Sequence, residues 1–172
     1  HESMDFFSST MQPVDTLPTA EPFPKKSTRT NMRALAVRAL HAKDVLLVRP
    51  YNGLRYDRLI PDGASAVVHG TYHSETANST RYSPYGMQNL LRRCRQQGIP
   101  CYLAPCHLHD GSYGSSCDLV DEGAIPLEGM TLHFAYGAVW VGCLLGYEGE
   151  ALTVFARQTR QLLESQSFRC CM

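Results

Sequence analysis

The stretch Asp44-Val-Leu-Leu-Val-Arg49 carries four apolar residues in an unbroken run. A strand with one face in water alternates apolar and polar residues, whereas a strand covered on both faces is apolar throughout. The run therefore predicts a strand of a parallel sheet, and Pro50 ends it because proline lacks the N–H that a ladder needs. Two further apolar runs, at 65–69 and 99–104, predict neighbouring strands.

Segments with helical spacing separate and follow these runs. After the pair Ser83-Pro84, apolar residues recur at i, i+3, i+4 and i+7, and Gly98 is expected to end this helix. Thr131 is the expected N-cap of a helix reaching 145, and a last helix is expected over 150–165. A short helix is expected within 53–60, while 33–40 fits either a strand or a helix. The sequence thus predicts an α/β fold with a small open, mostly parallel sheet of about four strands flanked by helices.

The chain has 172 residues, of which 44% are hydrophobic and 19% are charged, enough for one globular domain plus a tail. Residues 1–30 contain four prolines among many serines and threonines, so we expect a disordered tail or linker there. Residues 1–3 precede the first methionine and are interpreted as the remnant of a tag. The α/β domain is expected over 31–168, with a short tail at 169–172.

The overall charge argues against two classes of partner. Sixteen basic residues balance sixteen acidic ones, whereas binding to nucleic acid or to an anionic membrane surface depends on concentrated positive charge. No apolar run approaches the roughly 20 residues that a membrane span requires. We therefore expect no nucleic-acid partner and no membrane partner.

Seven cysteines, an odd number, and no secretory signal segment predict reduced thiols and a cytoplasmic protein. One group could hold zinc: Cys101, Cys106, His107, His109 and Cys117. The group lacks a C-x-x-C pair, so buried free thiols are the favoured interpretation and no metal is predicted. Neither a Walker A loop nor a G-x-G-x-x-G loop is present, and no cofactor is expected.

Two long polar loops, 70–83 and 105–116, follow the second and third expected strands. Ligands of open parallel sheets bind at the carboxyl ends of the strands, so these loops are expected to lie side by side there. They offer several titratable or hydrogen-bonding side chains: Tyr72, His73, Ser74, Glu75, Asn78, His107, His109, Asp110 and Ser112. The alternative is that these are ordinary solvated loop residues. A Ser74, His109 and Asp110 triad is disfavoured, since no G-x-S-x-G turn is present.

Three stretches carry a resemblance to a known family. They are Lys43-Asp-Val-Leu-Leu-Val-Arg-Pro-Tyr51, Val67-Val-His-Gly70, and Ile99-Pro-Cys-Tyr-Leu-Ala-Pro-Cys106 with Gly111, Tyr113 and Asp121-Glu-Gly-Ala-Ile-Pro-Leu-Glu-Gly-Met-Thr-Leu-His-Phe-Ala135. Together they resemble the C-terminal domain of the L-asparaginase/glutaminase family over about residues 43–146. The most specific part is the Gly-Ala-Ile-Pro to Met-Thr segment, 123–131.

The resemblance implies half of an amidohydrolase. Family enzymes hydrolyse the side-chain amide of Asn or Gln with threonine nucleophiles on a larger N-terminal domain, and this chain has no T-G-G-T-I segment. The C-terminal domain lends polar side chains to a neighbour's active site. His73 stands where the family has an asparagine, with Asn78 nearby, and Asp110 or Asp118 is nearest to the family's acid.

The resemblance therefore implies substrate-binding residues at His73, Ser74, Asn78 and Asp110, and no catalytic residue. The expected function is a non-catalytic half that completes or supports an amidohydrolase site and its oligomer. Its partner would be the nucleophile domain or a second copy, and its ligand a small amide or amino acid.

Two alternatives remain open. The chain is either an independent small-molecule or protein-binding module, or a self-sufficient hydrolase. The hydrolase alternative uses Thr71, because the segment 69–77 resembles the family's H-G-T-D-T-x-E-E-T-A signature. Tyr72 and His73 replace the Asp and Thr of that signature, so Thr71 is not the expected nucleophile.

Overall fold

A computed structural model describes residues 45–108 and 114–167. Its centre is a four-stranded sheet of β1 (Val45–Val48), β2 (Ala66–Gly70), β3 (Cys101–Cys106) and β4 (Ile125–Glu128). All three neighbouring pairs are parallel and the order is β1-β2-β3-β4. Every strand therefore ends at the same edge of the sheet, and this carboxyl edge is where loops from different strands meet.

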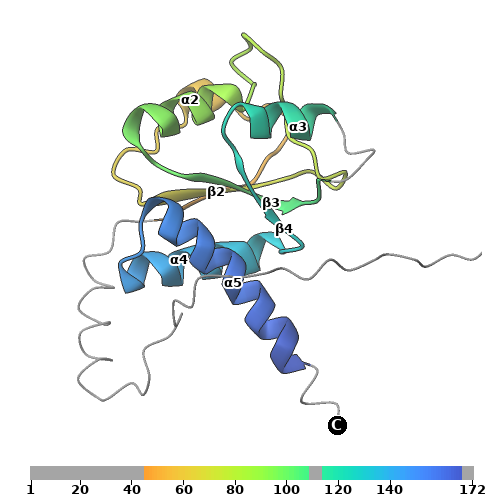
Figure 1. Cartoon of the computed structure of the whole chain (residues 1–172). Coiled ribbons are helices and arrows are strands. Elements are labelled where there is room, and N and C mark those ends of the chain that lie inside the picture. Colours follow the sequence, from red (N-terminus) through yellow and green to blue (C-terminus); the bar gives the residue numbers. More distant parts are fainter. Residues whose placement is uncertain (1–44, 109–113, 168–172) are drawn as a thin grey trace, which may run out of the picture.

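Helices cover both faces of the sheet (Figure 1). On one face lie α2 (Gln88–Gln97) and α3 (Gly114–Asp121), and on the other lie α4 (Leu132–Leu145) and α5 (Gly149–Ser167). A short 3-10 helix, η1 (Tyr56–Arg58), packs with α2 on the first face. The predicted α/β class is confirmed.

Alternate residues of each strand enter two separate cores, as the pleat of a strand requires. In β2, Val67 joins the core under α2 and α3, whereas Ala66 and Val68 join the core under α4 and α5. All three are fully buried. The sheet is thus covered on both faces, which is why its strands read as continuous apolar runs.

Most predicted elements are found within one or two residues of their expected ends. Gly98 and Gly146 adopt left-handed backbone at the ends of α2 and α4, with φ of 67° and 87°. Thr131 caps α4 through a hydrogen bond from the Phe134 N–H to its hydroxyl. Within 53–60 only η1 forms, a shorter helix than the one expected.

The fourth strand differs from the expectation. The sequence offers 33–40 as a further strand or helix, and that segment lies outside the described residues. Instead β4 forms from Ile125–Glu128, which contains Pro126. A strand at the edge of a sheet tolerates proline, because one row of its backbone groups has no neighbour to bond. The sequence of 118–122 resembles only one helical turn before Gly123, whereas helix α3 begins earlier, at Gly114.

The predicted tails at 1–30 and 169–172 lie outside the described residues. Within 45–108 and 114–167, no helix is both long and apolar enough to cross a membrane.

Candidate functional site at the carboxyl edge

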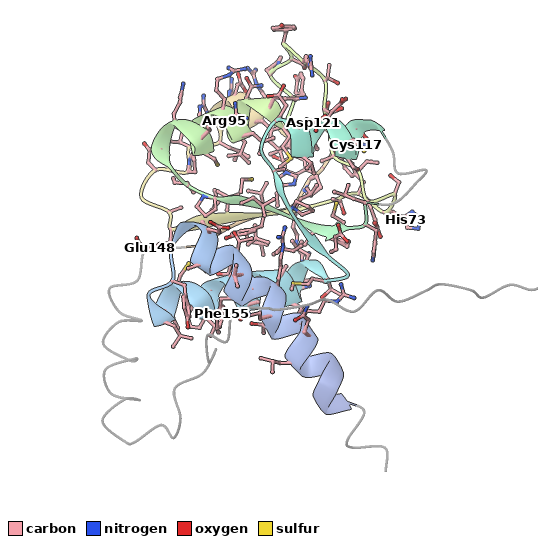
Figure 2. The ribbon with its side chains drawn as sticks, viewed as in Figure 1. His73, Arg95, Cys117, Asp121, Glu148 and Phe155 are labelled. Carbon is pink, nitrogen blue, oxygen red and sulfur yellow. The ribbon has the colours of Figure 1, made fainter. Side chains whose placement is uncertain are left out.

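The two polar loops meet at the carboxyl edge, as predicted. His107, directly after β3, places its Nδ1 2.8 and 2.9 Å from the two carboxylate oxygens of Glu75 in the loop after β2. The Thr71 hydroxyl donates to the Pro105 carbonyl at 2.9 Å. Figure 2 shows His73 and Cys117 on this side of the molecule, away from Glu148 at the other end of the sheet. The parallel topology has therefore brought two distant segments together.

Glu75 is held in a tight turn with left-handed backbone, at φ 57°. The Glu75 N–H donates to the Tyr72 carbonyl at 2.9 Å, and the Tyr72 N–H donates to the Thr76 carbonyl at 2.7 Å. The buried Ser116 hydroxyl of α3 donates to the Glu75 carbonyl at 2.8 Å. A non-glycine residue at positive φ is costly, and these bonds together hold the backbone of Glu75 in that conformation, from which its carboxylate reaches His107.

A carboxylate that accepts from Nδ1 of a histidine fixes the orientation of the imidazole ring. The side chains of Glu75 and His107 are 35% and 50% exposed, so a ligand from solvent can reach both. The carboxylate can accept from an ammonium or amide group, and the imidazole can serve as donor, acceptor or proton carrier. The pair is therefore suited to bind a small polar molecule that carries both donors and acceptors.

Three nucleophilic side chains near this pair, Thr71, Ser74 and Cys106, are either hydrogen-bonded to other groups or uncharged. The Thr71 hydroxyl proton is committed to the Pro105 carbonyl, and the Ser74 hydroxyl lies 2.9 Å from that of Thr76. Burial raises the pKa of the Cys106 thiol to about 11, and Glu75 adds to this effect through its charge. A thiol with such a pKa is uncharged at neutral pH and is a poor nucleophile.

The residues selected from the sequence as substrate-binding are dispersed. His73 and Ser74 are exposed in the loop after β2, next to Glu75. Asn78 is turned away, since its side-chain oxygen accepts from the Thr80 N–H at 2.9 Å and it lines a different cavity. Asp110 lies outside the described residues.

The sequence places Glu75 and His107 among the polar loop residues, and nothing in it distinguishes these two from the others. The strand order brings their loops together, and this could be anticipated. Their pairing depends on the turn at Glu75, which no residue preference indicates, because glutamate seldom adopts positive φ.

The three arginines of α2, at positions 92, 93 and 95, suggest a solvated helix face by their charge, but the structure pairs two of them with the protein. Arg93 is half-buried, and its guanidinium donates to the Leu59 carbonyl at 2.6 Å and the Asp57 carbonyl at 2.5 Å. Arg95 donates to the Glu122 carbonyl, just before Gly123. Arg92 is exposed, as expected, but the other two arginines connect α2 to neighbouring segments. This face of α2 is therefore in large part structural.

A buried polar pair lies beneath the loops. The Tyr56 hydroxyl is 2.9 Å from Nε2 of His69, the fourth residue of β2, and both side chains are almost fully buried. Burial lowers the pKa of His69 to about 4, and the Nδ1 atom of His69 has no hydrogen-bond partner. At neutral pH this histidine is uncharged and acts as part of the core.

Of the possible zinc ligands, Cys101 and Cys106 are buried and Cys117 is exposed, all three as free thiols. His109 lies outside the described residues. Among the residues that the structure describes, no group of three or more His, Cys, Asp or Glu side chains is placed to hold a metal ion.

The chain was compared with protein-family models and with curated proteins, and neither comparison gives a match.

Proposed function

We propose that the chain is a non-catalytic, amidohydrolase-like half domain. Its carboxyl edge binds a small amino acid or amide and completes an active site whose nucleophile belongs to a partner domain. The observation that supports this most directly is the Glu75–His107 pair, which joins the loops after β2 and β3. The resemblance of residues 43–146 to the C-terminal half of asparaginases supplies the substrate class.

Binding at this edge follows from the charges of the pair. The Glu75 carboxylate can accept from the ammonium group of an amino acid, and the His107 ring can contact its carboxylate or amide. The turn that holds Glu75 is fixed by Ser116 and by its own backbone bonds. Little ordering is then required when a ligand arrives, and such preorganisation favours binding.

Catalysis needs an activated nucleophile and a base within hydrogen-bond reach. Thr71, the candidate from the sequence, donates to a backbone carbonyl, which cannot remove its proton. The partner domain is therefore the proposed source of the nucleophile. The proposal includes a cytoplasmic location, because all five described cysteines are unpaired and free thiols are usual in reducing compartments.

Apolar side chains on α4 and α5 offer a surface for the partner. Trp140, Val141 and Val154 are 40%, 38% and 40% exposed. Light scattering is expected to show mass rising with concentration, since an exposed interface of this kind associates. A strict monomer at high concentration would argue against a second copy as the partner.

The ligand is tested by NMR titration with L-asparagine, L-glutamine and L-aspartate. We expect shifts at residues 71–76 and 107, with binding weakened at least about fivefold in Glu75→Gln, which removes the charge and keeps the shape. Glu150→Gln, at an exposed position of α5, is the matched control and should bind as the native chain does. Absence of binding to all three amino acids would contradict the proposal.

The same protein is then assayed for ammonia release from L-asparagine and L-glutamine. Release at the background rate is expected from the chain alone. Clear turnover that disappears in Thr71→Ala would identify a compact catalytic domain and overturn the assignment to a non-catalytic half.

A further inference from the structure

A cavity of about 380 Å³ lies between the segment after β1 and the loop that leads to α2. Four tyrosines contribute to its wall: Tyr51, Tyr56, Tyr72 and Tyr85. Polar residues, among them Asn78 and Ser83, line the rest. We call it the tyrosine groove. All nine described residues that line it are uncharged. Neither Glu75 nor His107 is among them, so the groove is distinct from the site at the carboxyl edge.

Several polar groups of the groove already have partners inside the protein. The Tyr56 hydroxyl is bound to His69, so this buried tyrosine can offer only its ring to a ligand. Asn78 uses its side-chain oxygen to accept from the Thr80 N–H, and the Ser83 hydroxyl accepts from the Tyr85 N–H at 3.2 Å. A ligand therefore meets aromatic faces more than a set of free amide and serine groups.

The hydroxyls of the other three tyrosines are available. Within the described chain, Tyr51, Tyr72 and Tyr85 make no hydrogen bond through their phenol groups. Tyr51 and Tyr85 are also 61% and 42% exposed. The groove thus combines flat rings with O–H donors at its rim, and aromatic residues exposed in this way are characteristic of recognition surfaces.

Both walls of the groove are held rigidly. On one side Arg93 donates to carbonyls of the η1 segment, and Arg55 forms a two-point contact with Asp57 at 3.0 and 2.6 Å. The Asp57 N–H donates to the Pro84 carbonyl at 3.2 Å and so links the two walls. On the other side the Asn89 amide donates to the Ser83 carbonyl at 2.7 Å. A groove fixed before binding loses little conformational entropy when it is filled.

The charges around the groove favour a neutral ligand. The Arg55 guanidinium lies 5.9 Å from the centre of the Tyr85 ring, so an organic cation would approach a positive group at the rim. An anion would find no cationic side chain among the described lining residues, and Arg55 beside them is already paired with the Asp57 carboxylate. A ligand with apolar rings and unpaired carbonyl oxygens matches both the faces and the donors.

We propose that the tyrosine groove is a docking site for a proline-rich peptide of a partner protein, bound as a polyproline II helix. Such a helix has flat pyrrolidine rings that pack on aromatic faces. Its backbone carbonyls make no internal hydrogen bonds, so they can accept from tyrosine hydroxyls. Since proline is already restricted in solution, the peptide also loses little entropy on binding.

The test measures fluorescence anisotropy of labelled decaproline with the full chain, and a labelled glycine-serine peptide of equal length is the control probe. Saturable binding of decaproline alone is expected. Tyr51→Ala and Tyr85→Ala should each weaken it at least about fivefold, and Tyr72→Phe about twofold to threefold because only a hydroxyl is lost. Ile60→Ala removes an exposed apolar side chain that does not line the groove and should leave binding unchanged.

Circular dichroism on each variant verifies the fold. Because Tyr51 is exposed, Tyr51→Ala is the substitution least able to disturb the fold. Three results would overturn the proposal. They are the absence of decaproline binding, equal binding of the glycine-serine peptide, and unchanged binding in folded Tyr51→Ala and Tyr85→Ala. If decaproline does not bind, direct titration with tetramethylammonium and with glucose tests whether the groove holds a small ligand instead.

Discussion

The two sides of the sheet are stabilised in different ways. Under α4 and α5 the packing is close: Gly142 allows the side chains of Leu152 and Phe155 to lie against the backbone of α4, and the buried Tyr102 hydroxyl is paired with that of Thr153. Under α2 and α3 the core holds polar atoms without a partner, Nδ1 of His69 and the side-chain oxygen of Gln88, and we call this the polar side. The loops of the candidate site and of the tyrosine groove are held from this side. The candidate site and the groove thus lie on the side whose buried polar atoms are incompletely paired.

The largest effect is expected from Gly142→Val in the close contact between α4 and α5. A Cβ at this position would lie 2.5 Å from Leu152 Cδ1 and 2.9 Å from Phe155 Cδ1. Overpacking of this kind costs roughly 1–3 kcal/mol for small additions and more for a branched side chain. Urea unfolding of the variant should show a loss of at least about 3 kcal/mol or failure to fold.

The matched control lies in the same helix. A Cβ added at Gly137 would have no heavy atom of a neighbouring segment within 4 Å, so Gly137→Ala should raise the free energy of unfolding by up to about 1 kcal/mol through helix propensity. Equal stability of Gly142→Val and Gly137→Ala would show that the contact between α4 and α5 is looser than the Gly142 distances require.

The second effect is a pH dependence confined to the polar side. Burial lowers the pKa of His69 to about 4, against 6.5 for an ordinary histidine. The unfolded chain therefore binds a proton that the folded chain does not, and stability falls as pH drops from about 6.5 to 4. The contribution is fully present above pH 6.5 or so and amounts to about 3 kcal/mol.

Unfolding at pH 7.5 and pH 4.5, in the native chain and in His69→Gln, measures this contribution. Carboxylates also destabilise the fold in acid, so the difference between the two proteins is the relevant quantity. The variant should lose less stability on acidification. Parallel pH curves would mean that His69 takes up a proton as readily in the folded protein as in the unfolded chain.

The third effect compares one buried tyrosine on each side. Tyr56→Phe leaves Nε2 of His69 without its partner, next to an Nδ1 atom that already has none. Tyr102→Phe removes a 3.0 Å contact with Thr153, whose hydroxyl retains the Gly149 carbonyl at 3.4 Å.

An unsatisfied buried group costs about 1–3 kcal/mol, against about 0.5–1.5 kcal/mol for an ordinary hydrogen bond. Thermal unfolding should therefore place Tyr56→Phe below Tyr102→Phe. The opposite order would remove the distinction between the two sides of the sheet.

The same contrast explains how much of the fold the sequence predicts. Apolar runs identify β1, β2 and β3 because a strand covered on both faces has no face in water. The fourth described strand is missed because Pro126 and Glu128 interrupt its apolar pattern, whereas β1, an edge strand of the same length, is an unbroken apolar run. Its pairing with β3 also has an irregular register between Leu103 and Cys106, and no local pattern indicates such an irregularity.

The site is predicted to the level of loops but not of side chains. Parallel strands require their following loops to share an edge, so the meeting of the loops after β2 and β3 could be derived. The contact of His107 with Glu75 joins residues far apart in the chain, and the side chain of Asn78 is turned away by a local bond from the Thr80 N–H. Residue type alone determines neither contact.

The smallest effect concerns what holds the Glu75 turn against α3. The Glu75–His107 contact is partly exposed, and exposed side-chain pairs of this kind contribute about 0–1 kcal/mol. The Ser116 hydroxyl is buried and donates to the Glu75 carbonyl, so Ser116→Ala leaves that carbonyl without its donor, at a cost of about 1 kcal/mol. Glu75→Gln should thus leave the melting temperature nearly unchanged, while Ser116→Ala lowers it.

Hydrogen exchange adds a local measurement, because Ser116→Ala should increase exchange of the Tyr72 and Glu75 amides. If Glu75→Gln increased exchange of these two amides and Ser116→Ala did not, the Glu75–His107 contact would be what holds the turn. Glu75 would then have to be assigned to stability instead of to ligand binding.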